Sequence, residues 1–108
     1  MPFQIQYAEA AANDIRALRA FDQRKVLDGI EEHLTHQPQQ TSRSRIKAMG
    51  QPFWSQYRLR IDDFRIYYDI DEENHVVNVL RVLEKGAEAT PLSPTENRTE
   101  DENSNLDR

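Results

Sequence analysis

The sequence predicts an α+β fold of the order β-α-α-β-β-β, with two N-terminal helices packed on one face of a mostly antiparallel four-stranded sheet. Three patterns indicate it. A short alternating segment opens the chain, two segments with helical spacing follow, and three alternating segments of strand length come after a polar stretch. Neither helical segment is long enough to be stable alone, so both need a sheet to pack against.

The N-terminal half supplies one strand and both helices. Residues 3–7 (FQIQY) alternate between apolar and polar side chains and predict the first strand. The apolar face of the first helix is Ala11, Ala12, Ile15 and Leu18. Asp22 is a suitable N-cap for the second helix. The apolar stripe of that helix is Val26, Leu27, Ile30 and Leu34. It should end at or before Gln37, because a residue that precedes proline disfavours helical backbone.

The C-terminal half supplies three strands. Residues 37–52 are polar and contain a glycine and a proline, so they predict a loop, with Ile46 tucked under its end. Residues 54–61 and 64–71 alternate on either side of an acidic two-residue turn and predict a hairpin. A looser turn then leads into a last strand over residues 75–83.

Charge divides the chain into a domain and a tail. The formal net charge is −5, but residues 1–87 carry 12 Lys/Arg against 13 Asp/Glu, while residues 88–108 carry 2 against 6. Residues 43–68 carry six basic side chains against two acidic ones. We therefore expect a folded domain over residues 1–87 with a local basic patch, and an acidic, disordered tail over residues 88–108.

Composition excludes several classes of site. The chain has no cysteine, which removes disulfides, thiolate metal sites and cysteine nucleophiles. Its three histidines, His33, His36 and His75, lack the spacing of a zinc site and are expected at the surface. No apolar run is as long as a membrane span, and the N-terminus lacks a signal pattern. We expect a cytoplasmic protein with no metal, no cofactor and no membrane partner.

The hairpin carries the residues of greatest chemical interest. Successive side chains of a strand point to opposite faces, so Arg58 and Arg60 share one face, and Arg65 and Tyr67 share one face of the next strand. A sheet with one solvated face should bury its apolar rows and expose these arginine rows. An exposed face of arginine and tyrosine suits phosphate and nucleotide recognition. The alternative is a solvated face whose arginines pair with the nearby Asp62, Asp63 or Asp69.

The same segments resemble the RelE/ParE superfamily of toxins from bacterial toxin–antitoxin systems, and the RelE branch more closely. The resemblance covers residues 3–87 and none of the tail. It is carried by Tyr7-Ala8-Glu9-Ala10, Arg45-Ile46-Lys47-Ala48-Met49-Gly50, Tyr57-Arg58-Leu59-Arg60, Phe64-Arg65-Ile66-Tyr67-Tyr68 and Val79-Leu80-Arg81-Val82. It implies a RelE-like fold and the toxin role in a type II system.

The resemblance to RelE implies a reaction and a set of site residues. RelE members enter the ribosomal A site and cleave messenger RNA by attack of a ribose 2′-hydroxyl on the adjacent phosphate. That chemistry needs a base, an acid and cations for the developing charge. The implied catalytic residues are Arg65, Arg58, Lys85 and Arg81, with Arg65 stabilising the transition state. The implied RNA- and phosphate-binding residues are Arg60, Lys47, Arg45 and Tyr67, with no metal.

The chain departs from the RelE pattern at three places. Gln56 and Arg58 occupy the positions of a lysine pair, the segment after Arg81 contains no tyrosine, and Asp62 replaces the glycine that is usual in the hairpin turn. Two other classes therefore stay open, namely a ParE-like inhibitor of DNA gyrase without enzymatic activity and a non-toxic member that retains antitoxin binding. For Arg81 a structural ion pair with a nearby carboxylate is also open.

The resemblance implies partners as well. They are a cognate antitoxin protein, which folds on binding, the ribosome with its messenger RNA, and operator DNA only through the antitoxin. One further hypothesis is that the acidic tail covers the basic face.

Overall fold

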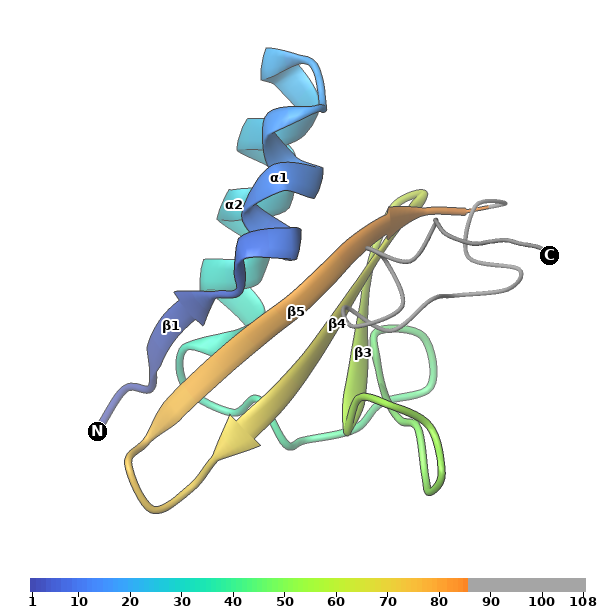
Figure 1. Cartoon of the computed structure of the whole chain (residues 1–108). Coiled ribbons are helices and arrows are strands. Elements are labelled where there is room, and N and C mark those ends of the chain that lie inside the picture. The colour runs from blue at the N-terminus through green and yellow to red at the C-terminus, as the bar shows by residue number, and fades with distance from the viewer. Residues whose placement is uncertain (86–108) are drawn as a thin grey trace, which may run out of the picture.

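The computed structural model describes residues 1–85, which form two helices and a five-stranded sheet (Figure 1). The helices are α1 (Glu9–Arg16) and α2 (Ala20–Leu34). The strands are β1 (Gln4–Tyr7), β2 (Ile46–Ala48), β3 (Tyr57–Ile61), β4 (Phe64–Asp71) and β5 (Val76–Glu84). The predicted α+β class, the two helices and the four predicted strands are all present. The expected disorder of residues 88–108 lies outside the described residues.

The sheet has the strand order β1-β5-β4-β3-β2, with β1 parallel to β5 and every other pair antiparallel. Both helices lie on the same side of it, with α1 packed on β5 and β1 and α2 packed on β3 (Figure 1). The other face of β3, β4 and β5 is therefore available for the rows of polar side chains. The placement of the helices on one face is confirmed.

The fifth strand, β2, corrects the prediction of a loop over residues 37–52. Ile46 pairs with Leu59 and Lys47 with Arg58 at the edge of β3. Three residues with one apolar side chain give no detectable alternation, so this strand depends on its partner rather than on local sequence. Ile46 is 5% exposed, which confirms that its side chain is buried as expected.

Two predicted boundaries are wrong. β3 begins at Tyr57 and not at residue 54, because the preceding residues fold over the outer face of the sheet. The N-cap of α2 is Arg19 rather than Asp22. Asp22 lies in the first helical turn, where its Oδ2 forms an ion pair with Arg19 Nε at 3.1 Å. The end of α2 at Leu34 agrees with the predicted stop before Gln37.

The core lies between the helices and the inner face of the sheet. Its fully buried side chains include Val26, Ile30, Leu34, Leu59, Ile66, Tyr68, Val77 and Val79. Gly29 permits the close approach of α2 to β3, since a Cβ atom there would lie 2.4 Å from Ile61 Cδ1. Tyr68 is the large polar member, and its hydroxyl donates to Pro38 O at 2.6 Å. Burial, with a smaller contribution from Tyr57, raises the pKa of Tyr68 well above the usual range.

The β3–β4 turn depends on Asp62. Its φ of 51° lies in the left-handed region, which Asp tolerates better than most residues because of its short polar side chain. Asp62 Oδ2 also lies 3.0 Å from Lys25 Nζ of α2. The turn is therefore tied to the helix layer, and this end of the hairpin has a defined position.

Candidate functional site

Strand register places four of the predicted residues in one row across the sheet. Lys47 of β2 faces Arg58 of β3, Arg58 faces Tyr67 of β4, and Tyr67 faces Arg81 of β5. The neighbouring row of Leu59, Ile66 and Val82 belongs to the core, so Lys47, Arg58 and Tyr67 lie on the face away from the helices. Arg81 lies at a register shift between β4 and β5, and its side chain reaches α1. The expected shared face of the hairpin arginines is thus present.

A second row lies nearer the β3–β4 turn. Arg60 faces Arg65, and Arg65 faces Leu83. Arg45 adjoins this row, because its carbonyl accepts from Arg60 N–H at 2.9 Å and its own Nη1 donates to Arg60 O at 3.1 Å. The sheet therefore brings together residues from three separate stretches of the chain.

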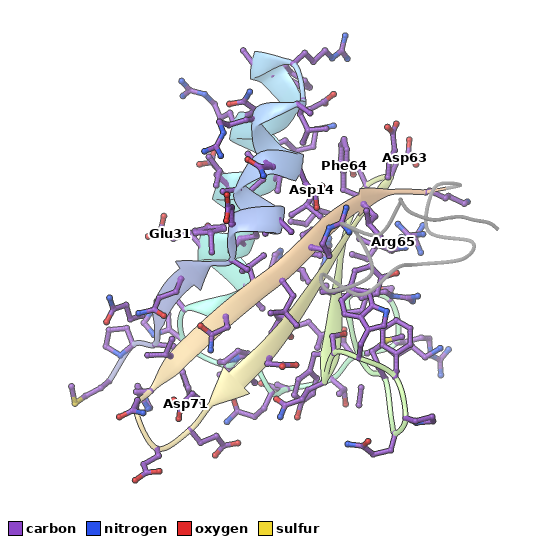
Figure 2. All side chains as sticks on the ribbon, in the orientation of Figure 1. Asp14, Glu31, Asp63, Phe64, Arg65 and Asp71 are labelled. Carbon is purple, nitrogen blue, oxygen red and sulfur yellow. The ribbon has the colours of Figure 1, made fainter. Side chains whose placement is uncertain are left out.

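Arg81 is held by a carboxylate of α1. Its Nε lies 2.7 Å from Asp14 Oδ2 and its Nη2 lies 3.0 Å from Asp14 Oδ1, a two-pronged ion pair. Asp14 Oδ2 also accepts from Val82 N–H at 2.9 Å, on the stretch of β5 beyond β1. Figure 2 shows Asp14 between the helices and β5. This geometry supports the structural alternative for Arg81, since its charge is already balanced.

Arg65 corrects the expectation of an exposed arginine face. It is 6% exposed, and its Nη1 donates to Asp62 O at 3.2 Å and Phe64 O at 3.4 Å. Its guanidinium therefore leans toward the hairpin turn, near Asp63 (Figure 2). Both contacts are made by the same nitrogen, Nη1.

Tyr67 is also buried, at 2% exposure, where alternation predicts an exposed side chain. The ring centroids of Trp54 and Phe53 lie 5.0 and 5.7 Å from that of Tyr67, and the two covering rings stack on each other at 5.0 Å. The segment between β2 and β3 thus covers the middle of the outer face. In this structure Tyr67 supports that aromatic cover, and its predicted stacking on a base would require the cover to move.

The accessible cations gather in a groove beside β2. We name it the cationic groove; it is a hollow of about 360 Å³ lined by Ser42, Arg43, Ser44, Arg45, Ile46, Lys47, Arg58 and Arg60. Five of the eight lining residues are basic and none is acidic. Arg58 Nε is buried there without a hydrogen-bond partner in the described part of the chain. The groove therefore presents positive charge to an anion.

Sequence reasoning missed Arg43 and the serines of this groove. Ser42 shapes its rim, because Ser42 Oγ accepts from Arg45 N–H at 3.0 Å and Ile46 N–H at 3.2 Å. The excess of basic residues over 43–68 was the available signal, but it did not say which cations would converge. Convergence depends on the pairing of β2 with β3.

Lys85 lies apart from the cationic groove. It is exposed directly after β5, and its N–H donates to Asp63 O at 2.6 Å. That contact places Lys85 at the turn end of the hairpin, the end at which Arg60 and Arg65 lie. Of the four predicted catalytic residues, Arg58 and Lys85 are accessible, whereas Arg65 and Arg81 are buried.

A larger hollow of about 700 Å³ lies between the segment before β3 and the end of β4. Its polar groups bind one another, since Gln56 N–H donates to Asp69 Oδ1 at 2.7 Å and Ile70 N–H donates to Gln56 Oε1 at 2.8 Å. Asp69 and Glu72 give it negative charge, which does not suit a phosphate. The cationic groove is therefore the better site for an anion.

The groove favours binding an anion over activating a nucleophile. Its lining offers guanidinium, ammonium and hydroxyl groups but no carboxylate or imidazole, so a general base would have to come from elsewhere. Within residues 1–85 no cluster of three His, Asp or Glu side chains is arranged to hold a metal. No helix among those residues is long and apolar enough to cross a membrane.

Fold and groove together define a small α+β domain that presents a cationic surface on the side of its sheet away from the helices. The chain belongs to the family of ParE toxins of type II toxin–antitoxin systems, whose model matches residues 5–87. No curated protein matches it significantly.

Solved structures share the fold. A chain of the RelBE2 toxin–antitoxin complex of Mycobacterium tuberculosis superimposes with a TM-score of 0.66 at 21% identity, covering 79% of this chain and 100% of its own. A mutant E. coli toxin RelE in the free state superimposes with a TM-score of 0.53 at 18% identity, covering 82% of this chain and 88% of its own. A chain of the RelE–RelB complex of Pyrococcus horikoshii superimposes with a TM-score of 0.52 at 16% identity, covering 80% of this chain and 98% of its own. The expected RelE/ParE superfamily is confirmed, with a ParE family model and RelE-type structures.

Proposed function

We propose that this toxin acts on ribosome-bound messenger RNA and that the cationic groove holds the RNA backbone. The observation that carries the proposal is the convergence of Arg43, Arg45, Lys47, Arg58 and Arg60 on one hollow with no acidic lining residue. The phosphate backbone is the part of a nucleic acid that such a surface attracts, whatever the sequence.

The geometry of the groove suits phosphate in particular. Arg58 and Arg60 alternate with the core residue Leu59, so both guanidinium groups project from the same strand face. A guanidinium can bind two phosphate oxygens at once, and two guanidinium groups of β3 line the groove. Lys47, opposite Arg58, adds an ammonium group to the same row.

The proposed reaction is cleavage through the ribose 2′-hydroxyl. Its oxygen forms a bond to the adjacent phosphorus, the bond from phosphorus to the 5′-oxygen breaks, and the 2′ proton leaves while another reaches the 5′-oxygen. Arg58 would bind the negative charge that develops on the phosphate. Lys85 is the exposed group at the turn end of the hairpin for the proton transfers, and Arg65 would act from beneath the surface.

The partners follow from the same proposal. The neighbours from Mycobacterium tuberculosis and Pyrococcus horikoshii are toxin–antitoxin complexes. We infer that this chain likewise has a cognate antitoxin, that it reaches operator DNA only through that protein, and that it acts in the cytoplasm, where ribosomes and messages are.

A reconstituted translation reaction with primer extension of the message tests the proposal. We expect cleavage within the ribosome-bound codon, and a loss of at least tenfold in its rate for Arg58→Gln/Arg60→Gln. Arg24→Gln is the matched control, because Arg24 is an exposed cation of α2 outside the groove. Intact message with the unmodified chain would contradict the proposal, and so would equal losses in the groove variant and the control.

Inhibition of DNA gyrase is the second candidate function. The observation that favours it is the match to the ParE family model over residues 5–87. The absence of a general base from the lining of the groove agrees with a toxin that binds rather than cleaves. A supercoiling assay with purified gyrase separates the two candidates: inhibition together with intact message would replace the ribonuclease proposal.

A further inference from the structure

We propose that the acidic C-terminal segment, residues 88–108, docks in the cationic groove of its own domain and competes there with RNA. This inference rests on the proposed function, since it gives a regulation to the same site.

The charges of the groove and of residues 88–108 are complementary. The groove collects five cations, and no acidic residue lines it. Residues 88–108 carry six carboxylates against two arginines. Three basic side chains elsewhere have acidic neighbours: Arg19 lies 3.1 Å from Asp22, Lys25 lies 3.0 Å from Asp62, and Arg81 lies 2.7 Å from Asp14. The groove is therefore the place where a carboxylate-rich segment meets several unbalanced cations at once.

The position of Lys85 places the start of the C-terminal segment near the groove. Its N–H bond to Asp63 O ties the last described residue to the β3–β4 turn. Leu83 faces Arg65 and Arg65 faces Arg60, so the end of β5 lies two strand spacings from the groove. Adjacent strands are about 4.8 Å apart, which makes this separation about 10 Å. The segment thus leaves the domain at the end of the hairpin that carries Arg60.

Residues 88–108 are also long enough to reach the groove. An extended chain spans about 3.3 Å per residue, so three or four residues bridge the distance from β5 to β3. Six carboxylates distributed over residues 88–108 can therefore reach the groove without strain. A short flexible tether holds its end at an effective concentration of about 1 mM, so even a weak contact is populated.

The expected effect on RNA binding is modest and depends on salt. A contact with an intrinsic dissociation constant of about 0.1 to 1 mM would occupy half to nine-tenths of the molecules at that effective concentration. RNA would then bind about 2- to 10-fold more weakly than it does to an open groove. Because the contact is between exposed charges, it should disappear at high ionic strength.

The test keeps the full chain and removes only the charges of the segment. The variant is Glu88→Gln, Glu96→Gln, Glu100→Gln, Asp101→Asn, Glu102→Gln and Asp107→Asn. The matched control neutralises six exposed carboxylates of the domain: Glu9→Gln, Asp28→Asn, Glu31→Gln, Glu32→Gln, Glu72→Gln and Glu73→Gln. Both variants change the net charge by the same amount, so a general charge effect appears in both.

Two measurements are made on each protein. Amide NMR spectra without RNA report residues 42–47 and 58–60 of the groove, and a titration with hexauridylate at low salt reports RNA affinity. We expect the tail variant alone to shift the groove amides and to bind hexauridylate 2- to 10-fold more tightly than the matched control. Both differences should vanish at about 0.5 M salt.

Groove amides that do not move in the tail variant would overturn the proposal, as would equal gains in affinity for both variants. The NMR measurement is independent of RNA, so its outcome differs from failure of the proposed function. If the groove amides shift and hexauridylate binds neither protein, the contact stands and the RNA target is wrong.

Discussion

At the scale of single residues, side chains of one type have different roles because their surroundings differ. Arg58 keeps a buried donor without a partner, whereas Arg81 is fully engaged by Asp14. The two arginines share one row of the sheet. The carboxylate of α1 therefore balances the charge of Arg81, whereas Arg58 lines the cationic groove.

Asp14→Ala should lower the free energy of unfolding by about 2 to 4 kcal/mol. The substitution leaves the nearly buried guanidinium of Arg81 and the N–H of Val82 without their acceptor. Urea unfolding followed by circular dichroism measures the change. Arg81→Gln should cost a similar amount, and the double variant should cost much less than the sum. Additive losses would show that the pair is not coupled.

Tyr68 makes stability depend on alkaline pH. Its pKa is raised in the folded state, so folding favours the neutral phenol. The stabilisation is fully present below the unfolded pKa of about 10 and is lost as the pH rises above that value toward the folded pKa. We expect the free energy of unfolding to fall above pH 10. In Tyr68→Phe this fall should be smaller, although the variant loses about 1 kcal/mol at neutral pH with the bond to Pro38 O.

Tyr7 is the matched comparison for that experiment. Burial and the nearby Glu31 also raise its pKa, so Tyr7→Phe removes a smaller part of the same alkaline fall. Identical pH profiles for Tyr68→Phe and the unmodified chain would contradict the assignment to Tyr68. Melting temperatures between pH 8 and 11 supply the profile.

At the scale of elements, the outer face of the sheet is divided between an aromatic cover and a groove. Phe53 and Trp54 lie over Tyr67 because the segment before β3 turns back across β4. The edge strand β2 then leaves the cations of β3 accessible beside that cover. Pairing of three residues, Ile46–Ala48, with β3 thus creates the cationic groove.

Tyr67→Ala should open the aromatic cover. Trp54 is the only tryptophan of the chain and packs on Tyr67, so its fluorescence reports this contact directly. We expect emission at longer wavelength and a loss of about 3 kcal/mol in the free energy of unfolding, as for other large aromatic deletions. Unchanged emission would show that Phe53 alone holds Trp54 in place.

The turn of the hairpin offers a test at the same scale. Asp62→Ala places a residue with a Cβ and no polar group at a φ of 51°, and it removes the ion pair with Lys25. We expect a loss of about 1 kcal/mol, and a smaller loss for Asp62→Gly, because glycine accepts left-handed backbone freely. Thermal melts of both variants and of Lys25→Ala separate the backbone effect from the ion pair.

At the scale of the whole molecule, the distribution of charge matters more than its total. The chain is acidic overall, yet every charged residue that lines the groove beside β2 is a cation. A polyanion responds to this local field at distances below the Debye length of about 8 Å at physiological ionic strength. A chain with a net negative charge can therefore present a cationic surface on one face.

The salt dependence of RNA binding measures how many groove cations contact phosphate. For single strands, the slope of log K against log salt is about −0.7 for each neutralised phosphate. Arg58→Gln/Arg60→Gln should therefore make the slope shallower by about 1.4, whereas Arg24→Gln should leave it unchanged. Fluorescence anisotropy of labelled hexauridylate over a series of salt concentrations provides both slopes. A groove variant with the slope of the unmodified chain would exclude the groove as the phosphate site.

The sequence by itself determined the α+β class, both helices, the hairpin and the shared face of Arg58, Arg60, Arg65 and Tyr67. These features follow from the period of the apolar residues, which is a local property of the chain. The sequence also indicated the resemblance to the toxin superfamily, because the most specific part of that resemblance lies in the residues of the hairpin. The roles of the predicted site residues remain predictions for the experiments above.

Only the tertiary structure decided which of those residues are accessible. Alternation assigns Arg65 and Tyr67 to the outer face but cannot reveal that other groups cover that face, so it predicts exposure where the structure has burial. The Asp14–Arg81 ion pair joins residues 67 positions apart, and the groove depends on a three-residue edge strand. Such contacts form because the folded chain brings distant segments together, and the local spacing of apolar residues does not predict them.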